Sequence, residues 1–207
     1  MKKTQKIMEW LNLIFERPYI VDEIKYSKGP LLMHMSDTPS EIFKYIIELV
    51  KILNPSYIIH TGDLVDNIKL ELTPQKRGKY IDLLNPFIEG LEGASNAKIY
   101  YAMGNHDEAK IVREAVQDGI VMESGHIKIE GLQFYINHYY LDENLQTQYY
   151  LYGHSFEPKS YKNQKHVGLN GIEGINVIDL SSEKIWVLPY PLGTNQFRKM
   201  ELRSTGL

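Results

Sequence analysis

Short polar segments rich in Asp, Asn and His follow apolar stretches at five places in the sequence. These segments are 36–38, 62–67, 104–108, 137–138 and 153–155. Carboxylate, amide and imidazole groups are the ligands expected for divalent Mn, Fe or Zn, and the glycines beside them allow tight turns. Because ligands of open α/β sheets bind beyond the carboxyl ends of the strands, we expect the five segments to meet at one metal site.

Two of these segments carry intact motifs. Residues 62–66 read Gly-Asp-x-x-Asp, and residues 104–107 read Gly-Asn-His-Asp. Through these motifs, in this order, the sequence resembles the calcineurin-like metallophosphoesterases over about residues 30 to 190. The resemblance implies an α/β fold in which two mixed β-sheets pack face to face with flanking helices. It also implies a metal-dependent hydrolase that acts on phosphomonoesters or phosphodiesters.

The resemblance further implies two adjacent metal positions that share Asp63 as a bridging ligand. The first position would take Asn105, His138 and His154 in addition, and the sequence contains all of these residues. We therefore expect one tightly held divalent ion, Mn, Fe or Zn, at this position.

The second metal position would take Asp37 and two further histidines, and there the sequence departs from the family pattern. Pro39 and Phe156 stand where those histidines are expected. Pro39 has an alternative explanation, since Thr38 can cap a helix that has Pro39 as its first residue and Glu41 as the capping-box partner. Phe156 cannot bind a metal, so we expect the second ion to be weak or absent.

His106 has a different implied role from the metal ligands. By the resemblance, this histidine contacts the phosphate and can protonate the leaving oxygen, while the following acid, Asp107, orients its ring. That is the chemistry of a general acid whose tautomer is fixed by a carboxylate. The alternative is a surface His–Asp pair that follows a strand and has no catalytic role.

The other four histidines could substitute for the missing ligands, but each has a simpler interpretation. His34 and His60 lie in apolar segments, where buried, hydrogen-bonded core histidines are expected. His126 alternates with apolar residues and is expected to face solvent. His166 lies in a polar stretch and is expected at the surface.

Several tyrosines flank the two histidine segments of the second half. Their rings could line a substrate pocket by stacking on a base or another ring, or they could reflect strand propensity alone. These residues are Tyr139, Tyr140, Tyr149, Tyr150 and Tyr152.

The elements that must position these segments alternate between strands and helices in the first half. Apolar runs predict strands near 31–36, 57–59 and 98–103, and helical spacing predicts helices over 42–53, 73–91 and 109–117. The first strand, helix and strand should form a parallel, right-handed unit. Asn54 and Pro55 should end the first helix, and Pro86 should kink or split the second.

The second half of the sequence is rich in predicted strands. They fall at 126–130, 132–136, 148–152, 174–180 and 184–188, and the last two should form a hairpin through residues 181–182. At the other end, residues 7–15 have helical spacing. We expect residues 1–29 to be a helical appendage packed on a metallophosphoesterase-like domain of residues 30–207.

Composition excludes several other functions. The sequence has 207 residues, no cysteine and a net charge of −3. Without cysteine there is no disulfide, thiol nucleophile or Cys-bound zinc, and the acidic balance argues against a nucleic-acid partner. The absence of a long apolar stretch and of a signal-peptide pattern argues against membrane insertion and favours a cytoplasmic location.

Two functional hypotheses follow. The first is a metal-dependent phosphoesterase whose partner is a small-molecule phosphoester. The alternative is a non-catalytic scaffold or binding protein that retains the metallophosphoesterase fold, which the missing ligands favour. The sequence gives no indication of the oligomeric state.

Overall fold

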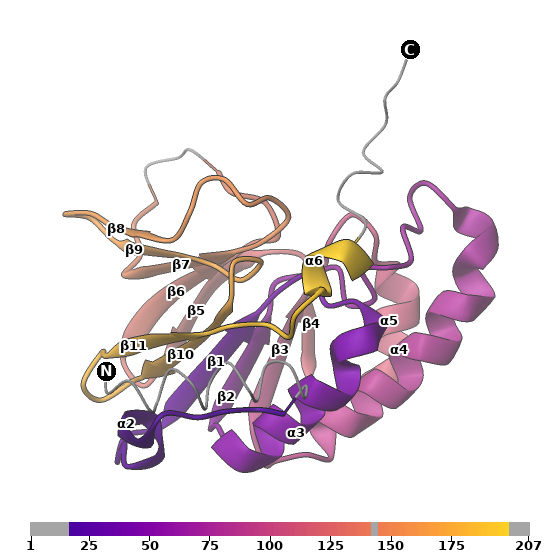
Figure 1. Cartoon of the computed structure of the whole chain (residues 1–207). Helices are drawn as coiled ribbons and strands as arrows, with labels where there is room; N and C mark the ends of the chain where they lie inside the picture. Colours follow the sequence, from indigo (N-terminus) through magenta and orange to yellow (C-terminus); the bar gives the residue numbers. More distant parts are fainter. Residues whose placement is uncertain (1–16, 142–144, 199–207) are drawn as a thin grey trace.

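Two mixed β-sheets lie face to face at the centre of the structure (Figure 1). The computed structural model describes residues 17–141 and 145–198. The first sheet has six strands, which in sheet order are Ile185–Leu188 (β11), Ile175–Asp179 (β10), Leu31–Met35 (β1), Tyr57–His60 (β2), Lys98–Ala102 (β3) and Ile120–Met122 (β4). Strands β1 to β4 are parallel, while β10 runs antiparallel to β1 and forms the expected hairpin with β11.

The second sheet has five strands and is also mixed. In sheet order they are Gly125–Ile129 (β5), Leu132–Ile136 (β6), Tyr149–Tyr152 (β7), Val167–Asn170 (β9) and Tyr161–Lys162 (β8). Strands β6, β7 and β9 are parallel, and the two edge strands pair antiparallel with their neighbours. The predicted two-sheet fold is therefore confirmed, although the sequence pattern does not predict β4, β8 or β9.

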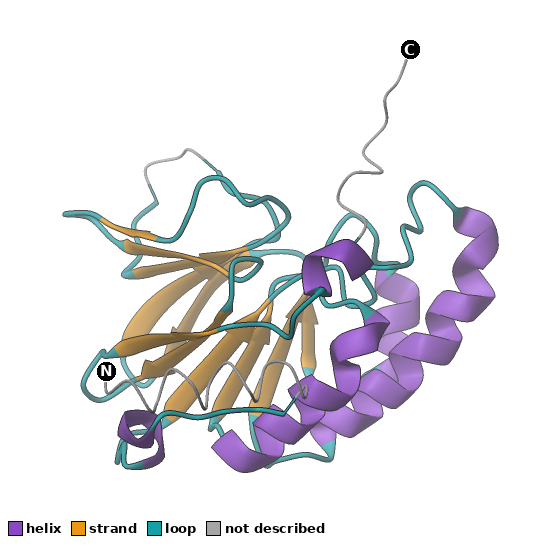
Figure 2. Ribbon diagram, viewed as in Figure 1, coloured by secondary structure: helices purple, strands orange, loops and turns teal. Residues whose placement is uncertain are grey.

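Three helices cover the outer face of the six-stranded sheet (Figure 2). They are Phe43–Leu53 (α3), Arg77–Glu92 (α4) and Ala109–Ala115 (α5). Since successive residues of a strand point to opposite faces, β1 serves two apolar clusters. Met33 packs in the cluster on the helix side, whereas Leu32 packs in the cluster between the sheets.

The predicted effects of Asn54, Pro55 and Pro86 on the helices can be compared with the structure. Asn54 ends α3 in the left-handed conformation, with φ of 45°, as its position before Pro55 predicts. Pro86, however, does not split α4, which continues through it. The reason is packing, because Phe87 and Leu91 beyond the proline are buried in the core and hold the helix in place.

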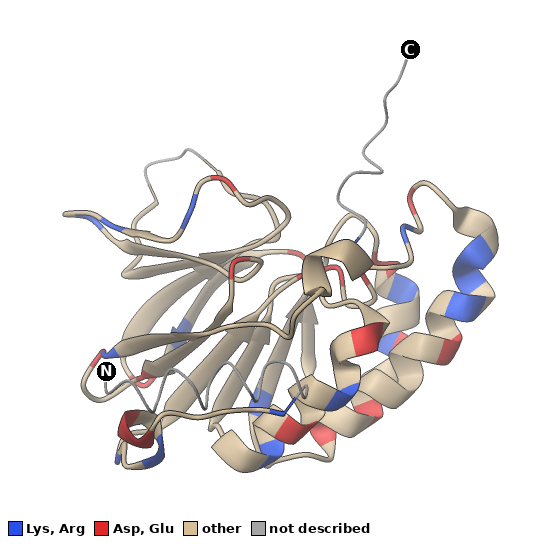
Figure 3. Cartoon of the chain, in the orientation of Figure 1, with Lys and Arg blue, Asp and Glu red and all other residues tan. Residues whose placement is uncertain are grey.

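Four short helical segments complete the described secondary structure. They are Asp22–Lys25 (α2), Ser40–Ile42 (η1), Pro74–Lys76 (η2) and Thr194–Phe197 (α6). The helix predicted over 7–15 lies outside the described residues, and the division at residue 30 stays a prediction. In Figure 3, basic and acidic residues are interspersed along the helices. Within the described part of the chain, no helix has the length and apolar character needed to cross a membrane.

Candidate metal centre

The predicted site residues meet at the carboxyl ends of the central strands. The strands β1, β2, β3, β6 and β7 all end at this edge. The residues that follow them are Asp37, Asp63, Asn105, His106, His138 and His154. Contacts link all six, so the structure brings these predicted residues together. The seventh, Asp107, contacts the backbone nitrogen of Asp63.

Three side-chain donor atoms converge on one nitrogen, Nε2 of His138. Asn105 Oδ1 and His154 Nδ1 each lie 3.2 Å from it, and Asp63 Oδ2 lies 3.5 Å away. Nδ1 of His138 contacts the carbonyl of Thr61 at 2.7 Å, which orients the ring with Nε2 toward the other donors. Ligands about 2.1 Å from a tetrahedral ion lie about 3.4 Å apart, so this donor set fits a divalent metal ion.

Asp63 and His138 are strongly coupled by charge. Burial alone would lower the pKa of His138, but the charge of Asp63 and its hydrogen bond outweigh it and raise that pKa to about 10. Burial would likewise raise the pKa of Asp63, but His138 holds it well below its usual range. A metal ion bound here would take the place of the proton on His138.

The loops that carry these donors need unusual backbone conformations. Asp37, Asp63 and His154 have φ values of 52°, 57° and 66°, a region that non-glycine residues seldom adopt. Gly62 has a φ of 98°, and a Cβ there would lie 2.5 Å from the nitrogen of Gly104. Backbone strain of this kind is concentrated at functional sites, where the surrounding structure holds it.

Asp37 is held by the protein itself. Its Oδ2 accepts hydrogen bonds from the hydroxyl of Ser36 at 2.6 Å and from the backbone nitrogen of His154 at 3.0 Å. Among the described residues, two groups of three donors could hold a metal, and Asp37 belongs to neither. Its carboxylate therefore supports the loop of His154.

The helix start predicted around Pro39 is wrong in detail. Pro39 is extended and precedes the turn η1, rather than being the first residue of a helix. The hydroxyl of Thr38 does not cap this turn, because it contacts His60 Nε2 at 2.9 Å and donates to the carbonyl of Leu64 at 3.0 Å. Pro39 thus lies one residue before the turn, and its carbonyl accepts a hydrogen bond from the nitrogen of Ile42 at 3.1 Å.

Asp107 does not orient the ring of His106 as expected. Its carboxylate accepts four hydrogen bonds of 2.7 to 2.9 Å. The donors are the backbone nitrogens of Asp63, Leu64 and Gly104 and the hydroxyl of Tyr80. Four donors satisfy a carboxylate, so Asp107 joins the loops after β2 and β3. Burial, with the charge of Asp63, raises the pKa of Asp107 to about 6.

The ring of His106 has other neighbours. Its backbone nitrogen donates to Asp63 Oδ1 at 2.9 Å, while its ring nitrogens lie 3.1 and 3.2 Å from Asn105 Nδ2. Glu71 lies 3.8 Å from the ring, and donor atoms of Asp63, Asp66 and His106 lie within 4.8 Å of one another. Asp66 stands in the Gly-Asp-x-x-Asp motif, which could have indicated it, whereas no sequence signal indicates Glu71.

Arg198 is a buried arginine at this edge that sequence reasoning missed. Its guanidinium donates to the carbonyls of Asp37 at 2.7 Å, Ile172 at 2.8 Å and Ser36 at 3.3 Å. Its side chain is fully buried and stacks on the ring of Tyr190, 4.4 Å from the centroid. Arg198 therefore fixes the loop after β1 from the far end of the described chain.

The remaining histidines have the positions that their sequence context predicts. His34 is buried and contacts the hydroxyl of Thr61 at 3.1 Å. His60 is also buried, and burial lowers the pKa of each to about 3. His126 is exposed, and His166 is partly exposed. None of these four histidines belongs to a donor group among the described residues.

Of the five flanking tyrosines, three are buried, Tyr140 is partly exposed and Tyr139 is exposed. Tyr149, Tyr150 and Tyr152 are buried in β7, which supports the packing interpretation for these three. Tyr139 differs, because it is 42% exposed and its ring centroid lies 4.5 Å from that of His154.

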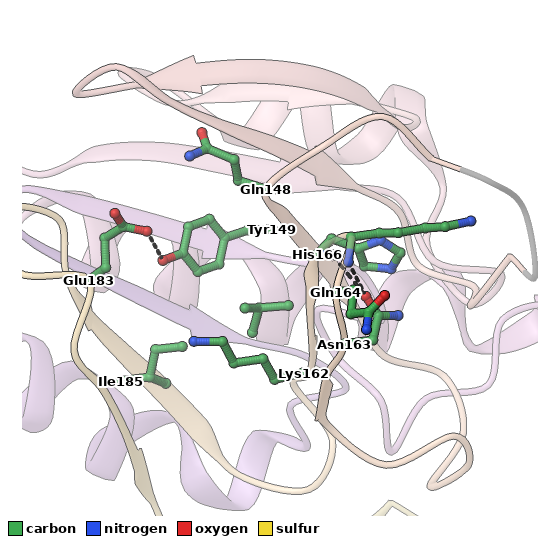
Figure 4. A pocket seen from close by; sticks show the side chains of 10 residues that line it. Gln148, Tyr149, Lys162, Asn163, Gln164, His166, Glu183 and Ile185 are labelled. Atoms are coloured by element: carbon green, nitrogen blue, oxygen red, sulfur yellow. Dashed lines mark hydrogen bonds between the residues drawn. The ribbon is translucent and has the colours of Figure 1, made fainter.

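A separate cavity lies at the other end of the second sheet (Figure 4). It has a volume of about 230 Å³ and includes Tyr149, the first residue of β7, whereas the metal centre follows the last. The hydroxyl of Tyr149 donates to Glu183 at 2.9 Å within it. None of the predicted site residues lines this cavity.

The fold and the donor set define the class of protein. The chain belongs to the calcineurin-like phosphoesterase family, which it matches over residues 31–194. Its fold is similar to that of an archaeal phosphodiesterase, with a TM-score of 0.56 and 20% identity over 75% of this chain and 97% of the other. It is also similar to Yfce, a phosphoesterase from E. coli, with a TM-score of 0.50 and 15% identity over 78% of this chain and 99% of that one. No curated protein matches the chain.

Proposed function

We propose that this chain hydrolyses a small-molecule phosphoester with one divalent metal ion, held by Asp63, Asn105, His138 and His154. The observation that carries the proposal is the convergence of three donors on Nε2 of His138, at 3.2, 3.2 and 3.5 Å. Family membership supports a phosphoesterase activity in general. A hydrolysis screen with Mn, Fe and Zn distinguishes among these metals and between monoesters and diesters.

Each ligand has a definite part in this proposal. When bound, the ion would supply a Lewis acid that lowers the pKa of a water and stabilises negative charge on the phosphoryl group. Asp63 would neutralise part of the positive charge of the ion. Its Oδ1 also accepts a hydrogen bond from the backbone nitrogen of His106. His138 is kept in orientation by its contact with the carbonyl of Thr61. Asp107 positions Asp63 by accepting hydrogen bonds from the loop that carries it.

His106 is the proposed general acid. Its backbone is anchored to Asp63, while its ring lies near Asp66 and Glu71. Burial lowers the pKa of this histidine, and the charge of Asp63 opposes that shift. A negatively charged phosphoryl oxygen beside the ring would favour the protonated form, from which a proton can pass to the leaving oxygen.

Tyr139 is the proposed contact for the leaving group. It is the most exposed of the five flanking tyrosines, at 42%, and it packs beside His154. A planar leaving group can stack on such a ring. The net charge of −3 offers no general attraction for nucleic acid, so we propose a small substrate, and a cytoplasmic location stays a prediction.

A non-catalytic scaffold is the second candidate, and one observation favours it. Pro39 and Phe156 occupy two expected ligand positions. A scaffold, however, has no evident need for a complete set of four donors or for His106. The two candidates therefore differ in whether an ion and a turnover rate can be measured.

The test combines metal analysis with a hydrolysis screen. Purified protein is dialysed against chelator, reloaded with Mn, Fe or Zn, and analysed for bound metal per chain. The same samples are then assayed on aryl phosphomonoesters and phosphodiesters. We expect one retained ion and metal-dependent hydrolysis. Absence of hydrolysis with every metal would reject the enzyme in favour of the scaffold.

A further inference from the structure

Lys69 is an almost buried lysine beside the candidate metal centre. Its ammonium forms an ion pair with Oδ1 of Asp66. The side chain of Lys69 is only 13% exposed, and that of Asp66 is 0% exposed. Lysines are seldom buried to this extent unless they are paired, so this contact belongs to the interior of the site and not to its solvated surface.

The pair adjoins the second donor group of the site. Donor atoms of Asp63, Asp66 and His106 lie within 4.8 Å of one another. The other carboxylate oxygen of Asp66, Oδ2, is buried and has no hydrogen-bond partner among the described residues. This group therefore has an unused acceptor, and the cation already in contact with it is Lys69.

The charges around Asp66 indicate why a cation is needed there. The carboxylates of Asp37, Asp63 and Asp66 all lie at this edge of the sheet, and the ammonium of Lys69 contacts the carboxylate of Asp66. One divalent ion leaves these three carboxylates with excess negative charge, which would repel a phosphoester. A fixed positive charge beside them reduces that repulsion.

We propose that the ammonium of Lys69 is the second cation of this site, where it excludes a second divalent ion from the Asp63, Asp66 and His106 group and favours phosphate binding. This inference rests on the proposed one-metal phosphoesterase. Lys69 supplies a covalently attached positive charge beside the Asp63, Asp66 and His106 group.

The test is a titration of metal-free protein with Mn²⁺, with free and bound ion measured by equilibrium dialysis and elemental analysis. Lys69→Met removes the charge while keeping most of the length, and we expect it to bind a second ion about 10-fold more tightly than wild type, given the cost of placing like charges together. Lys69→Arg keeps the charge and should behave like wild type. Lys184→Met, which removes an exposed ion-paired lysine, is the matched control.

A second measurement follows the substrate side. Inorganic phosphate is titrated calorimetrically into protein loaded with one equivalent of Mn²⁺. We expect the affinity to fall about 10-fold in Lys69→Met and to be kept in Lys69→Arg, since a unit charge near the phosphate is lost only in the first. Lys69→Gln serves if Lys69→Met does not fold. An unchanged phosphate affinity, or no gain of a second ion in the neutral variants, overturns the role of Lys69.

The two proposals fail in different ways. A wild-type protein that binds no ion contradicts the proposed function. A wild-type protein and a Lys69→Met variant that each bind one ion, with equal affinity for phosphate, contradict only the role of Lys69.

Discussion

The two halves of the metal centre use their polar atoms differently. Around His138, donor atoms of Asp63, Asn105 and His154 face one another at distances suited to a shared ion. At Asp37, the carboxylate instead accepts hydrogen bonds from Ser36 and His154. One half thus presents lone pairs to a common point, whereas in the other half Oδ2 of Asp37 accepts hydrogen bonds from the protein.

This contrast shows that a residue of an expected ligand type can serve to hold a loop. Asp37 holds the loop of His154 by accepting a hydrogen bond from the backbone nitrogen of His154. The presence of an expected ligand type is weaker evidence of metal binding than the direction in which its oxygens point.

The largest expected effect comes from removing one ligand of the proposed metal ion. His154→Ala removes one of four donors, so metal affinity should fall by more than about 100-fold and hydrolysis should be lost with it. Elemental analysis after dialysis and the hydrolysis rate measure both. His126→Ala, which changes an exposed histidine, is the control and should keep both properties. Retention of one ion per chain in His154→Ala would show that the donor set is wrong.

His106→Ala should separate chemistry from metal binding. The ring of His106 is not among the four proposed ligands, so metal content should stay at one ion per chain. Turnover should fall by about 10²- to 10⁴-fold, as is usual for the loss of a positioned general acid. Steady-state kinetics at saturating metal measure this, with His166→Ala as control. Wild-type turnover in His106→Ala would exclude the assigned role.

Asp107→Ala tests the hydrogen bonds that hold the loops of the metal centre together. The change leaves three backbone N–H groups and the hydroxyl of Tyr80 without their acceptor, so the free energy of unfolding should fall by about 3 kcal/mol or more. Urea denaturation measures it. Glu108→Ala, at an exposed ion pair with Arg77, should cost less than about 1 kcal/mol. Equal costs for the two variants would contradict the structural role of Asp107.

Restoring the missing ligands should make the halves more alike. The double variant Pro39→His with Phe156→His should raise the affinity for a second ion about 10-fold, because two imidazoles are added near Asp37. Metal titration of this variant against wild type measures the gain. No gain would show that these positions are too far from Asp37 to share an ion with it.

The smallest effect is expected at Asp37 itself. Asp37→Asn keeps the size of the side chain and an oxygen acceptor for the nitrogen of His154. Affinity for the first ion should therefore change by less than about 10-fold. Asp63→Asn, measured in the same titration, should lose the ion. Equal losses in the two variants would mean that Asp37 binds the first ion directly.

The sequence predicts the fold and the meeting of the site residues well, for a definite physical reason. Polar residues that follow apolar strands must lie at the strand ends, and parallel strands bring those ends to one edge. Asp63, Asn105 and His138 come together on this basis. Strand β4, with only three residues, and β8, with two, are too short to give a clear alternation.

The sequence could not predict where individual side chains point. Asp107 follows His106 in the chain, yet its carboxylate accepts a hydrogen bond from the backbone nitrogen of Asp63. The conformation of the turn sets the direction of each side chain, and the sequence pattern does not specify that conformation. Lys69 and Arg198 have no motif, and only the folded chain brings them to the site. The helix start near Pro39 shows the same limit. The sequence predicts Thr38 as the cap, but the acceptor for the nitrogen of Ser40 is Asn67, which comes from another loop.

The position of Arg198 has a consequence for how the molecule matures. It holds the carbonyl of Asp37, a residue 161 positions earlier in the chain. During synthesis, the loop after β1 leaves the ribosome long before its guanidinium partner exists, so this edge of the metal centre can close only late. For the same reason, a protease that cuts just before Arg198 would loosen the loop of Asp37 while leaving both sheets intact.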